Sequence, residues 1–205
     1  DYGKIFGRIW SFEITSDDNL LWTSGKGQNG HLKQFSVRHG KMIKDYGALF
    51  ENDGVMSIIT TPDNKYLFAA SERGHLKQIC LESQQVVHDY GKIHDGGITC
   101  LETTRDSKWL ITGSYDGHVK RISVENRQVD KDLGQVCDYI MRMKITADDE
   151  KFFVGDYGGQ LKLISLIDGQ VIKDFGQVHD DRITGILITV DQRFFFVSSG
   201  DGVLT

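Results

Sequence analysis

The chain has 205 residues and a formal net charge of −5, with 39% hydrophobic and 26% charged residues. This balance excludes a disordered chain, and an acidic composition without a Lys/Arg cluster argues against phosphate binding, so we expect no nucleic-acid partner. No apolar run approaches the roughly 18 residues that a membrane-spanning helix needs, so we also expect no membrane insertion.

A three-residue landmark, Asp followed by an aromatic residue or leucine and then by glycine, recurs every 42–44 residues. Its copies begin at Asp1, Asp45, Asp89, Asp132 and Asp174. We expect the glycine to form a tight turn, because glycine adopts backbone angles that other residues avoid. The landmarks delimit units 1–44, 45–88, 89–131 and 132–173 and a partial unit 174–205.

The third unit shows most clearly the elements expected in every unit. Its strands are predicted at 98–102, 109–112, 118–124 and 128–131, with turn residues between them. The second strand is the most apolar in nearly every unit, with runs at 20–22, 66–68, 152–154 and 194–197. Such runs predict burial on both faces of the strand. The third strand begins with G-H-L-K-Q or a close variant, at 30–34, 74–78, 117–121 and 159–163.

Strands at close, regular spacing indicate an all-β protein. A four-stranded unit cannot bury both of its faces alone, so the units must stack, and stacked units close naturally into a ring. The repeat therefore predicts a β-propeller built of four-stranded blades. Because the chain opens at 1–4 in what resembles a last strand and stops within the fifth unit, we expect a segment of a larger ring, with seven blades as the working number and a closed five-blade ring as the alternative.

The segment from Gly113 to Val119 resembles the repeat of the WD-repeat β-propeller family, and the resemblance extends over essentially the whole chain. It departs from the family at the name-giving Trp-Asp pair, which is Ile122-Ser123 here and is absent from every unit. The resemblance implies that a turn aspartate pairs with a histidine in the loop before the first strand, in a buried hydrogen-bond network. The matching residues are His94 with Asp116 and His179 with Asp201, whereas Asn29, Arg73 and Gly158 replace the aspartate elsewhere.

Three further patterns are better explained by the repeat than by chemistry. The G-x-G-x-x-G at 25–30 precedes a predicted strand, not the helix that a dinucleotide site needs. Asp174-Phe175-Gly176 spells a kinase metal-binding tripeptide but is a copy of the landmark. His31, His75 and His118 occupy the same position of the repeat. In a ring they would be spread one per unit and would not converge on a metal. We therefore expect no catalysis, no cofactor and no metal.

Residues that vary between units lie in the loops before each first strand and between the second and third strands. Loops on a rigid scaffold commonly carry function, and Tyr and Arg commonly anchor interfaces. The candidate partner-binding residues are Arg8, Asp95, Tyr115, Tyr139, Asp180 and Arg182, with Tyr157 beside them.

These observations favour a protein-interaction scaffold that binds a partner protein or peptide on the face formed by these loops. A regulatory or targeting region of a larger catalytic protein, and a ligand-binding or enzymatic propeller, are the alternatives. The spacings of Cys80, Cys100 and Cys137 match no metal or redox motif and favour a reducing compartment. We expect a cytoplasmic protein, with association with the cytoskeleton or a cilium as the alternative.

Overall fold

The computed structural model describes residues 8–26 and 31–205. In these ranges the regular structure is entirely β-strand. The Asp1 landmark, the strand tail at 1–4, Asn29 and the end of the 25–30 glycine motif lie outside the described residues. The strands are β1 (Arg8–Ile14), β2 (Leu20–Lys26), β3 (His31–Ser36), β4 (Lys41–Ala48), β5 (Val55–Thr60), β6 (Tyr66–Ser71), β7 (His75–Cys80), β8 (Gln85–Lys92), β9 (Ile98–Thr103), β10 (Trp109–Ser114), β11 (His118–Ser123), β12 (Gln128–Gln135), β13 (Ile140–Ile145), β14 (Lys151–Asp156), β15 (Gln160–Ser165), β16 (Val171–Gln177), β17 (Ile183–Ile188) and β18 (Phe195–Ser199).

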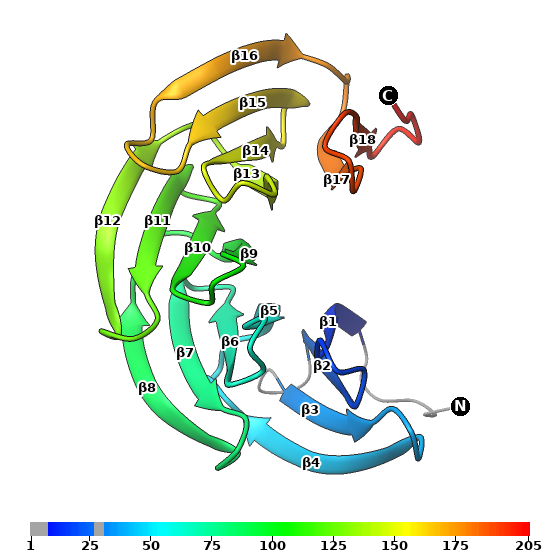
Figure 1. Ribbon diagram of the computed structural model, residues 1–205, viewed down its shortest axis with the longest axis vertical. Helices are drawn as coiled ribbons and strands as arrows, with labels where there is room; N and C mark the ends of the chain where they lie inside the picture. The colour runs from blue at the N-terminus through cyan, green and yellow to red at the C-terminus, as the bar shows by residue number, and fades with distance from the viewer. Residues whose placement is uncertain (1–7, 27–30) are drawn as a thin grey trace.

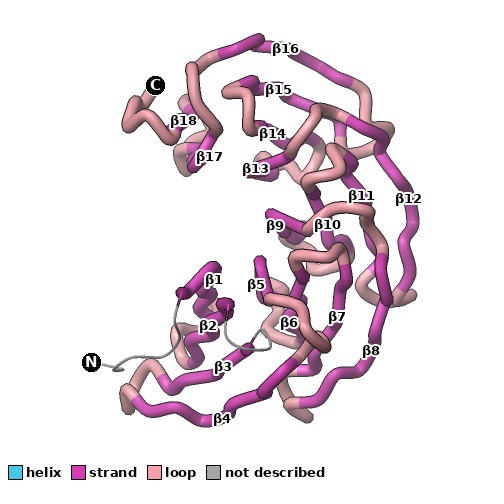
Figure 2. The backbone as a smooth tube through the Cα atoms, turned by 180° about the vertical axis from the view of Figure 1, so that it is seen from behind, coloured by secondary structure: helices cyan, strands magenta, loops and turns pink. Residues whose placement is uncertain are grey.

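The strands form five sheets in chain order, and within each sheet successive strands pair antiparallel. Four sheets have four strands, β1–β4, β5–β8, β9–β12 and β13–β16, and the fifth contains β17 and β18. Figure 1 shows the sheets along an open arc, with the first strand of each on the inside and the fourth on the outside. The view from behind shows the same order, with β1 and β18 on either side of the opening (Figure 2). The predicted all-β, propeller-type architecture of four-stranded sheets is confirmed.

The second strand of each internal sheet buries residues on both of its faces, as its apolar run predicted. In β6, Leu67 and Ala69 pack into the core between the first and second sheets. Their neighbours Phe68 and Ala70 pack into the core between the second and third sheets. Alternate residues of a strand point to opposite faces, so one strand contributes to two cores.

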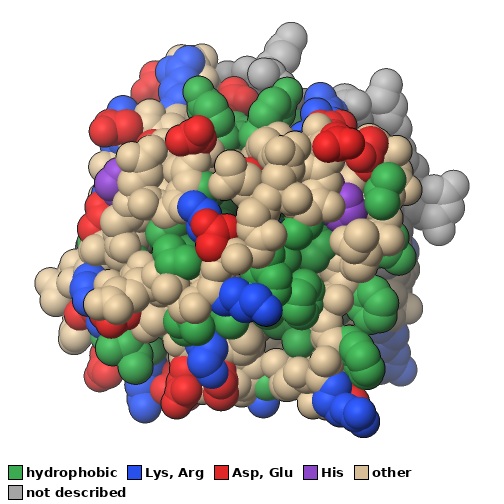
Figure 3. Space-filling model, turned by 90° about the horizontal axis from the view of Figure 1, so that it is seen from above, with side chains coloured by type: hydrophobic (Ala, Val, Ile, Leu, Met, Phe, Trp, Pro, Cys, Tyr) green, Lys and Arg blue, Asp and Glu red, His purple; other side chains and the backbone are tan. Residues whose placement is uncertain are grey.

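The two sheets at the ends of the arc have only one covered face. Phe12 in β1 is 71% exposed and Leu187 in β17 is 68% exposed. Phe194, in the apolar run predicted to be buried, is 58% exposed. Seen from above, hydrophobic side chains reach the surface beside charged ones (Figure 3). Burial of the second strand on both faces therefore holds for the internal sheets and not for the fifth, whose outer face has no sheet against it in the structure.

The Asp-aromatic-Gly landmark lies inside the outer strand, so the expected tight turn is wrong. Gly91 has φ +67° and Gly134 has φ +94°, and the register between the third and fourth strands shifts beside each of them. The glycine forms a β-bulge, which needs positive φ just as many turns do. The units counted from the landmarks therefore begin inside the outer strands.

The lysine of the G-H-L-K-Q signature binds the chain beside this bulge. Lys77 Nζ donates to the carbonyl of Leu49 at 2.9 Å and lies 3.3 Å from the Asp89 carboxylate. Lys120 Nζ repeats the arrangement with the carbonyl of Ile93 at 2.6 Å. The two strongest sequence signatures therefore hold neighbouring parts of the scaffold together.

Asp63 holds the hairpin between β5 and β6, the first and second strands of the second sheet. Thr61 Oγ1 donates to Asp63 Oδ1 at 2.6 Å, and the next residue, Asn64, has φ +55°. The Asn64 side chain also accepts from the N–H of Ser16 in the first sheet at 2.9 Å. A similar link joins the N–H of Arg105 to Asp149 at 2.9 Å. These hairpins join successive sheets.

No helix in the described chain is long and apolar enough to cross a membrane.

Candidate functional site

The variable loops of the second to fifth sheets lie at one edge of the arc. The first two strands of each sheet are antiparallel, so the loop before the first strand and the turn after the second meet at the same end. The N–H of Tyr115 donates to the carbonyl of Gly97 at 2.9 Å, and the N–H of Tyr157 donates to that of Tyr139 at 3.0 Å. We call this edge the loop face. Its described residues are 51–54, 72–74, 93–97, 115–117, 136–139, 157–159, 178–182 and 200–202.

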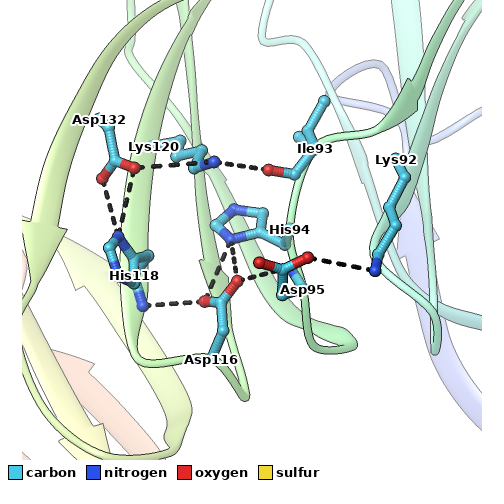
Figure 4. Close-up of a pocket in the computed structure, with 8 residues that line it drawn as sticks. All are labelled: Lys92, Ile93, His94, Asp95, Asp116, His118, Lys120 and Asp132. Carbon is cyan, nitrogen blue, oxygen red and sulfur yellow. Dashed lines mark hydrogen bonds and ion pairs between the residues drawn. The ribbon is translucent and has the colours of Figure 1, made fainter.

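His94 and Asp116, which the sequence places in one network, meet on the loop face of the third sheet. His94 Nδ1 lies 3.0 Å from Asp116 Oδ2, and His94 Nε2 lies 2.8 Å from Thr112 Oγ1 (Figure 4 shows the His94–Asp116 contact). The Asp116 carboxylate also accepts from the N–H groups of Asp95 at 2.8 Å and His118 at 2.9 Å. One aspartate therefore joins a histidine ring, the loop before β9 and the start of β11.

Burial and hydrogen bonding have opposite effects on ionisation of the carboxyl in this network. Burial lowers the pKa of His94, against the opposing effect of the Asp116 charge. Burial also opposes ionisation of Asp116, but the His118 N–H, the His94 ring and the Asp95 N–H together lower the pKa of that carboxyl. A neutral His94 therefore donates from Nδ1 to a charged Asp116 and accepts at Nε2 from the Thr112 hydroxyl.

The order Thr112, His94, Asp116 has the connectivity of a hydrolytic triad, in which a hydroxyl, an imidazole and a carboxylate are hydrogen-bonded in series. A nucleophile must be reachable by its substrate, but Thr112 is fully buried and the His94 side chain has no exposed surface. The arrangement can therefore orient loops and satisfy buried polar atoms, and it cannot attack a substrate.

A polar hollow of about 370 Å³ lies beside this network, between the loop before β9 and strands β11 and β12. Its side chains bind one another: Lys92 lies 3.2 Å from Asp95, and His118 lies 3.1 Å from Asp132 (Figure 4). The polar groups that line the hollow are already paired, so it offers little to a ligand.

His179 and Asp201 do not form the corresponding pair. His179 Nε2 lies 3.2 Å from the carbonyl of Val197 and 2.9 Å from Thr205 Oγ1. Asp201 accepts from the hydroxyl of Ser199 and from its own turn, through the N–H of the residue two further on. Val197 occupies the position of Thr112, so Nε2 of His179 meets a backbone carbonyl and the Thr205 hydroxyl in place of a threonine hydroxyl of the second strand.

A row of three tyrosines crosses the junction between the third and fourth sheets on the loop face. The rings of Tyr115 and Tyr139 lie 6.5 Å apart, centroid to centroid, and those of Tyr139 and Tyr157 lie 6.5 Å apart. Both pairs meet edge to face, at 68° and 70°. Tyr139 and Tyr157 are each 55% exposed. We call Tyr115, Tyr139 and Tyr157 the tyrosine row.

The row arises where equivalent positions of the repeat carry different residues. The residue directly before the first strand is Gly54, Gly97, Tyr139 or Arg182 in the second to fifth sheets. The residue directly after the second strand is Glu72, Tyr115, Tyr157 or Gly200 in the same sheets. The same backbone hydrogen bond joins these two positions in each sheet. A constant backbone therefore presents changing side chains.

The remaining predicted residues lie apart from the tyrosine row, in β1 and along the loop face. Arg8 is exposed and lines the central hollow, about 790 Å³ in volume, which Tyr115 also lines. The Asp95 side chain is 95% exposed and pairs with Lys92. Asp180 and Arg182 are exposed in the fifth sheet. The structure thus brings Tyr115 and Tyr139 together, places Arg8 at the same hollow as Tyr115, and leaves Asp95, Asp180 and Arg182 at separate points of the loop face.

The central hollow also contains charged groups that the sequence analysis missed. Glu102 in β9 forms an ion pair with Lys144 in β13 at 3.1 Å, and Glu13 in β1 accepts from Thr60 Oγ1 at 3.0 Å. Burial raises the pKa of Glu102, against the effect of Lys144, and burial also raises the pKa of Glu13. The sequence does show charged residues within these first strands, at Glu13, Glu102 and Lys144, and they were the signal for this cluster.

Comparison with known families identifies one repeat. Residues 85–121 match the WD domain, G-beta repeat family. The matched segment runs from β8 into β11 and contains the linked residues His94, Thr112 and Asp116. A search of the curated proteins found no match.

Proposed function

We propose that this chain, a divergent WD-repeat protein, is an interaction scaffold that holds a partner protein or peptide on its loop face. WD repeats generally mediate protein interactions and are typically non-catalytic. Fold alone does not assign function, so the proposal depends on a site. The observation that carries it is the tyrosine row.

The tyrosine row has the properties of an interface anchor. Tyr139 and Tyr157 expose large aromatic side chains, whereas many other large hydrophobic side chains of the chain are buried. Their backbones are joined to each other by a hydrogen bond, so little backbone freedom is lost when a partner covers them. Tyrosine is enriched among the residues that dominate binding energy, and a pre-ordered aromatic surface favours tight contact.

A capture experiment with variants tests this function. The purified chain is immobilised and exposed to a lysate of its source organism, and retained proteins are identified by mass spectrometry. We expect Tyr139→Ala together with Tyr157→Ala to reduce retention of a specific partner by about tenfold or more, because loss of a hot-spot residue commonly costs about 2 kcal/mol.

Phe194→Ser is the matched control. Phe194 is an aromatic residue of similar exposure, 58%, in the hairpin before β18 at the opposite edge of the fifth sheet. It should leave retention of the partner unchanged. Retention that is equal in the tyrosine variant and the wild type, or loss that is equal in both variants, would show that the loop face is not the binding surface.

The cellular compartment is a further part of the proposal. Cys80, Cys100 and Cys137 are free thiols, and burial raises the pKa of Cys100 and of Cys137 to about 12. Thiols that stay protonated and unpaired suit a reducing environment. We therefore propose that the scaffold is cytoplasmic, and fluorescence imaging of the tagged protein would test this proposal.

A further inference from the structure

We propose that the partner contributes an extended basic segment, with arginines at alternate positions that stack on Tyr115, Tyr139 and Tyr157. This inference rests on the proposed function and adds the chemistry of the ligand and its conformation. Three observations support it: the spacing of the rings, the charge of the surrounding loops and the exposure of Tyr139 and Tyr157.

The ring spacing matches an extended chain. A β-strand rises about 3.3 Å per residue and a polyproline II helix about 3.1 Å, so residues two apart lie about 6.2–6.8 Å from each other. The centroids of successive rings in the tyrosine row are 6.5 Å apart. Alternate side chains of an extended segment point to the same side. One segment can therefore place residues i, i+2 and i+4 on successive tyrosines.

The loops around the row are acidic. In the third to fifth sheets the described loop-face residues contain six aspartates and one arginine: Asp95, Asp116, Asp138, Asp180, Asp181, Asp201 and Arg182. Asp116 and Asp201 accept hydrogen bonds within the chain, and Asp95 pairs with Lys92. Asp138, directly before Tyr139, and Asp180, in the loop before β17, are exposed. Complementary charge guides encounter and excludes partners of like charge, so this surface favours a cationic segment.

Exposed tyrosine rings select the kind of cation. An arginine or lysine over a tyrosine face is attracted by the ring quadrupole within about 6 Å of the centroid. The planar guanidinium of arginine also stacks on the ring, which a lysine ammonium cannot do. This chain already uses such contacts within its own fold: the Arg121 guanidinium lies 4.7 Å from the Trp109 ring centroid, and Lys44 Nζ lies 4.3 Å from that of Tyr46.

Fluorescein-labelled peptides test the proposal by fluorescence anisotropy with the 205-residue chain. The test peptide is GRSRSRG. The comparison peptides are GKSKSKG, GESESEG and GRSSRSSRG, the last of which places its arginines three residues apart. We expect GRSRSRG to bind most tightly, GKSKSKG and GRSSRSSRG several-fold more weakly, and GESESEG not at all.

Variants show whether binding depends on the row. Tyr139→Ala should weaken GRSRSRG about tenfold, Tyr139→Phe should change binding less than about twofold because it keeps the ring, and Phe194→Ser should have no effect. Circular dichroism confirms that each variant is folded. Equal binding of GRSRSRG to all variants, or no binding to the wild type, would overturn the inference.

The outcomes separate this inference from the proposed function. If GESESEG or a neutral peptide binds in a Tyr139-dependent way, the loop face is a binding surface and the basic-segment inference is wrong. If no peptide binds but capture of a protein still requires Tyr139, the scaffold proposal stands without an extended basic ligand. If neither peptide nor protein binding requires Tyr139, both proposals fail.

Discussion

Replacement of Asp116 by alanine should destabilise the third sheet more than any change to an exposed aspartate. The side chain is 16% exposed and accepts from His94 Nδ1 and from the N–H groups of Asp95 and His118. Alanine removes every one of these acceptors, and the His94 ring is too deeply buried to find water instead. A buried donor left without a partner costs about 1–3 kcal/mol, so we expect a loss of about 2–3 kcal/mol in the free energy of unfolding.

Urea unfolding followed by circular dichroism measures this loss. The matched control is Asp95→Ala, because that side chain is almost fully exposed and its backbone N–H, which bonds Asp116, remains. The control removes only an exposed pair with Lys92 and should cost less than about 0.5 kcal/mol. Asp116→Asn keeps one oxygen and should fall between the two.

The reasoning would be refuted if Asp116→Ala and Asp95→Ala unfold at the same urea concentration with the same slope. Hydrogen exchange adds a local test. Amides of β9 and β10 should lose protection in Asp116→Ala before those of β14, because the lost bonds join the loop before β9 to the turn after β10.

Three further predictions concern pH, backbone and surface. Burial lowers the pKa of His94, so the unfolded chain binds more protons than the folded chain near and below pH 6.5. The free energy of unfolding should therefore fall as the pH drops from 7.5 to 5.5. In His94→Gln the fall in the urea midpoint over this range should be smaller. Gly134→Ala should cost about 1 kcal/mol for its positive φ alone, whereas Gly117→Ala should cost about 3 kcal/mol or more, because its Cβ would lie 2.0 Å from a backbone carbonyl; thermal melts compare them. The exposed Phe12 and Leu187 on the end faces should make the chain self-associate, and serine at both positions should weaken this association in sedimentation velocity.

The repeat could be predicted from the sequence because its turn chemistry recurs in phase. Thr61-x-Asp63 and Thr104-x-Asp106 form the same hydrogen-bonded hairpin, with hydroxyl-to-carboxylate distances of 2.6 and 2.7 Å. Local bonds of this kind depend on residues two apart, so the sequence contains everything that they need.

The bulge could not be distinguished from a turn on sequence grounds. Both conformations require a glycine with positive φ, and Gly91 and Gly134 satisfy either. The difference lies in strand pairing, where Leu76 opposes Gly91 and the next residue, Lys77, opposes Asp89. Pairing between strands is a non-local property, and a single copy of the landmark does not show it.

The two His–Asp pairs show a second limit of sequence reasoning. The interval from His94 to Asp116 equals that from His179 to Asp201, and yet only the first pair forms. The two histidines also differ in the group that faces Nε2 from the second strand, which is the Thr112 hydroxyl in one and the Val197 carbonyl in the other. A pair of motifs at the right spacing is therefore insufficient, and the residue facing the other side of the ring must be included.

The extent of the tyrosine row is limited by packing against the neighbouring sheet. A side chain at Gly54 would bring its Cβ to 2.4 Å from the Trp10 ring, and one at Gly97 would lie 2.7 Å from the carbonyl of Glu72. At the equivalent position of the fourth sheet Tyr139 is 55% exposed, so the loop face can present a large side chain there and not at the two glycines. Close packing between sheets at these positions thus limits where the loop face can carry a large side chain. The tyrosine row lies on the third and fourth sheets, each of which has a neighbouring sheet on both of its faces.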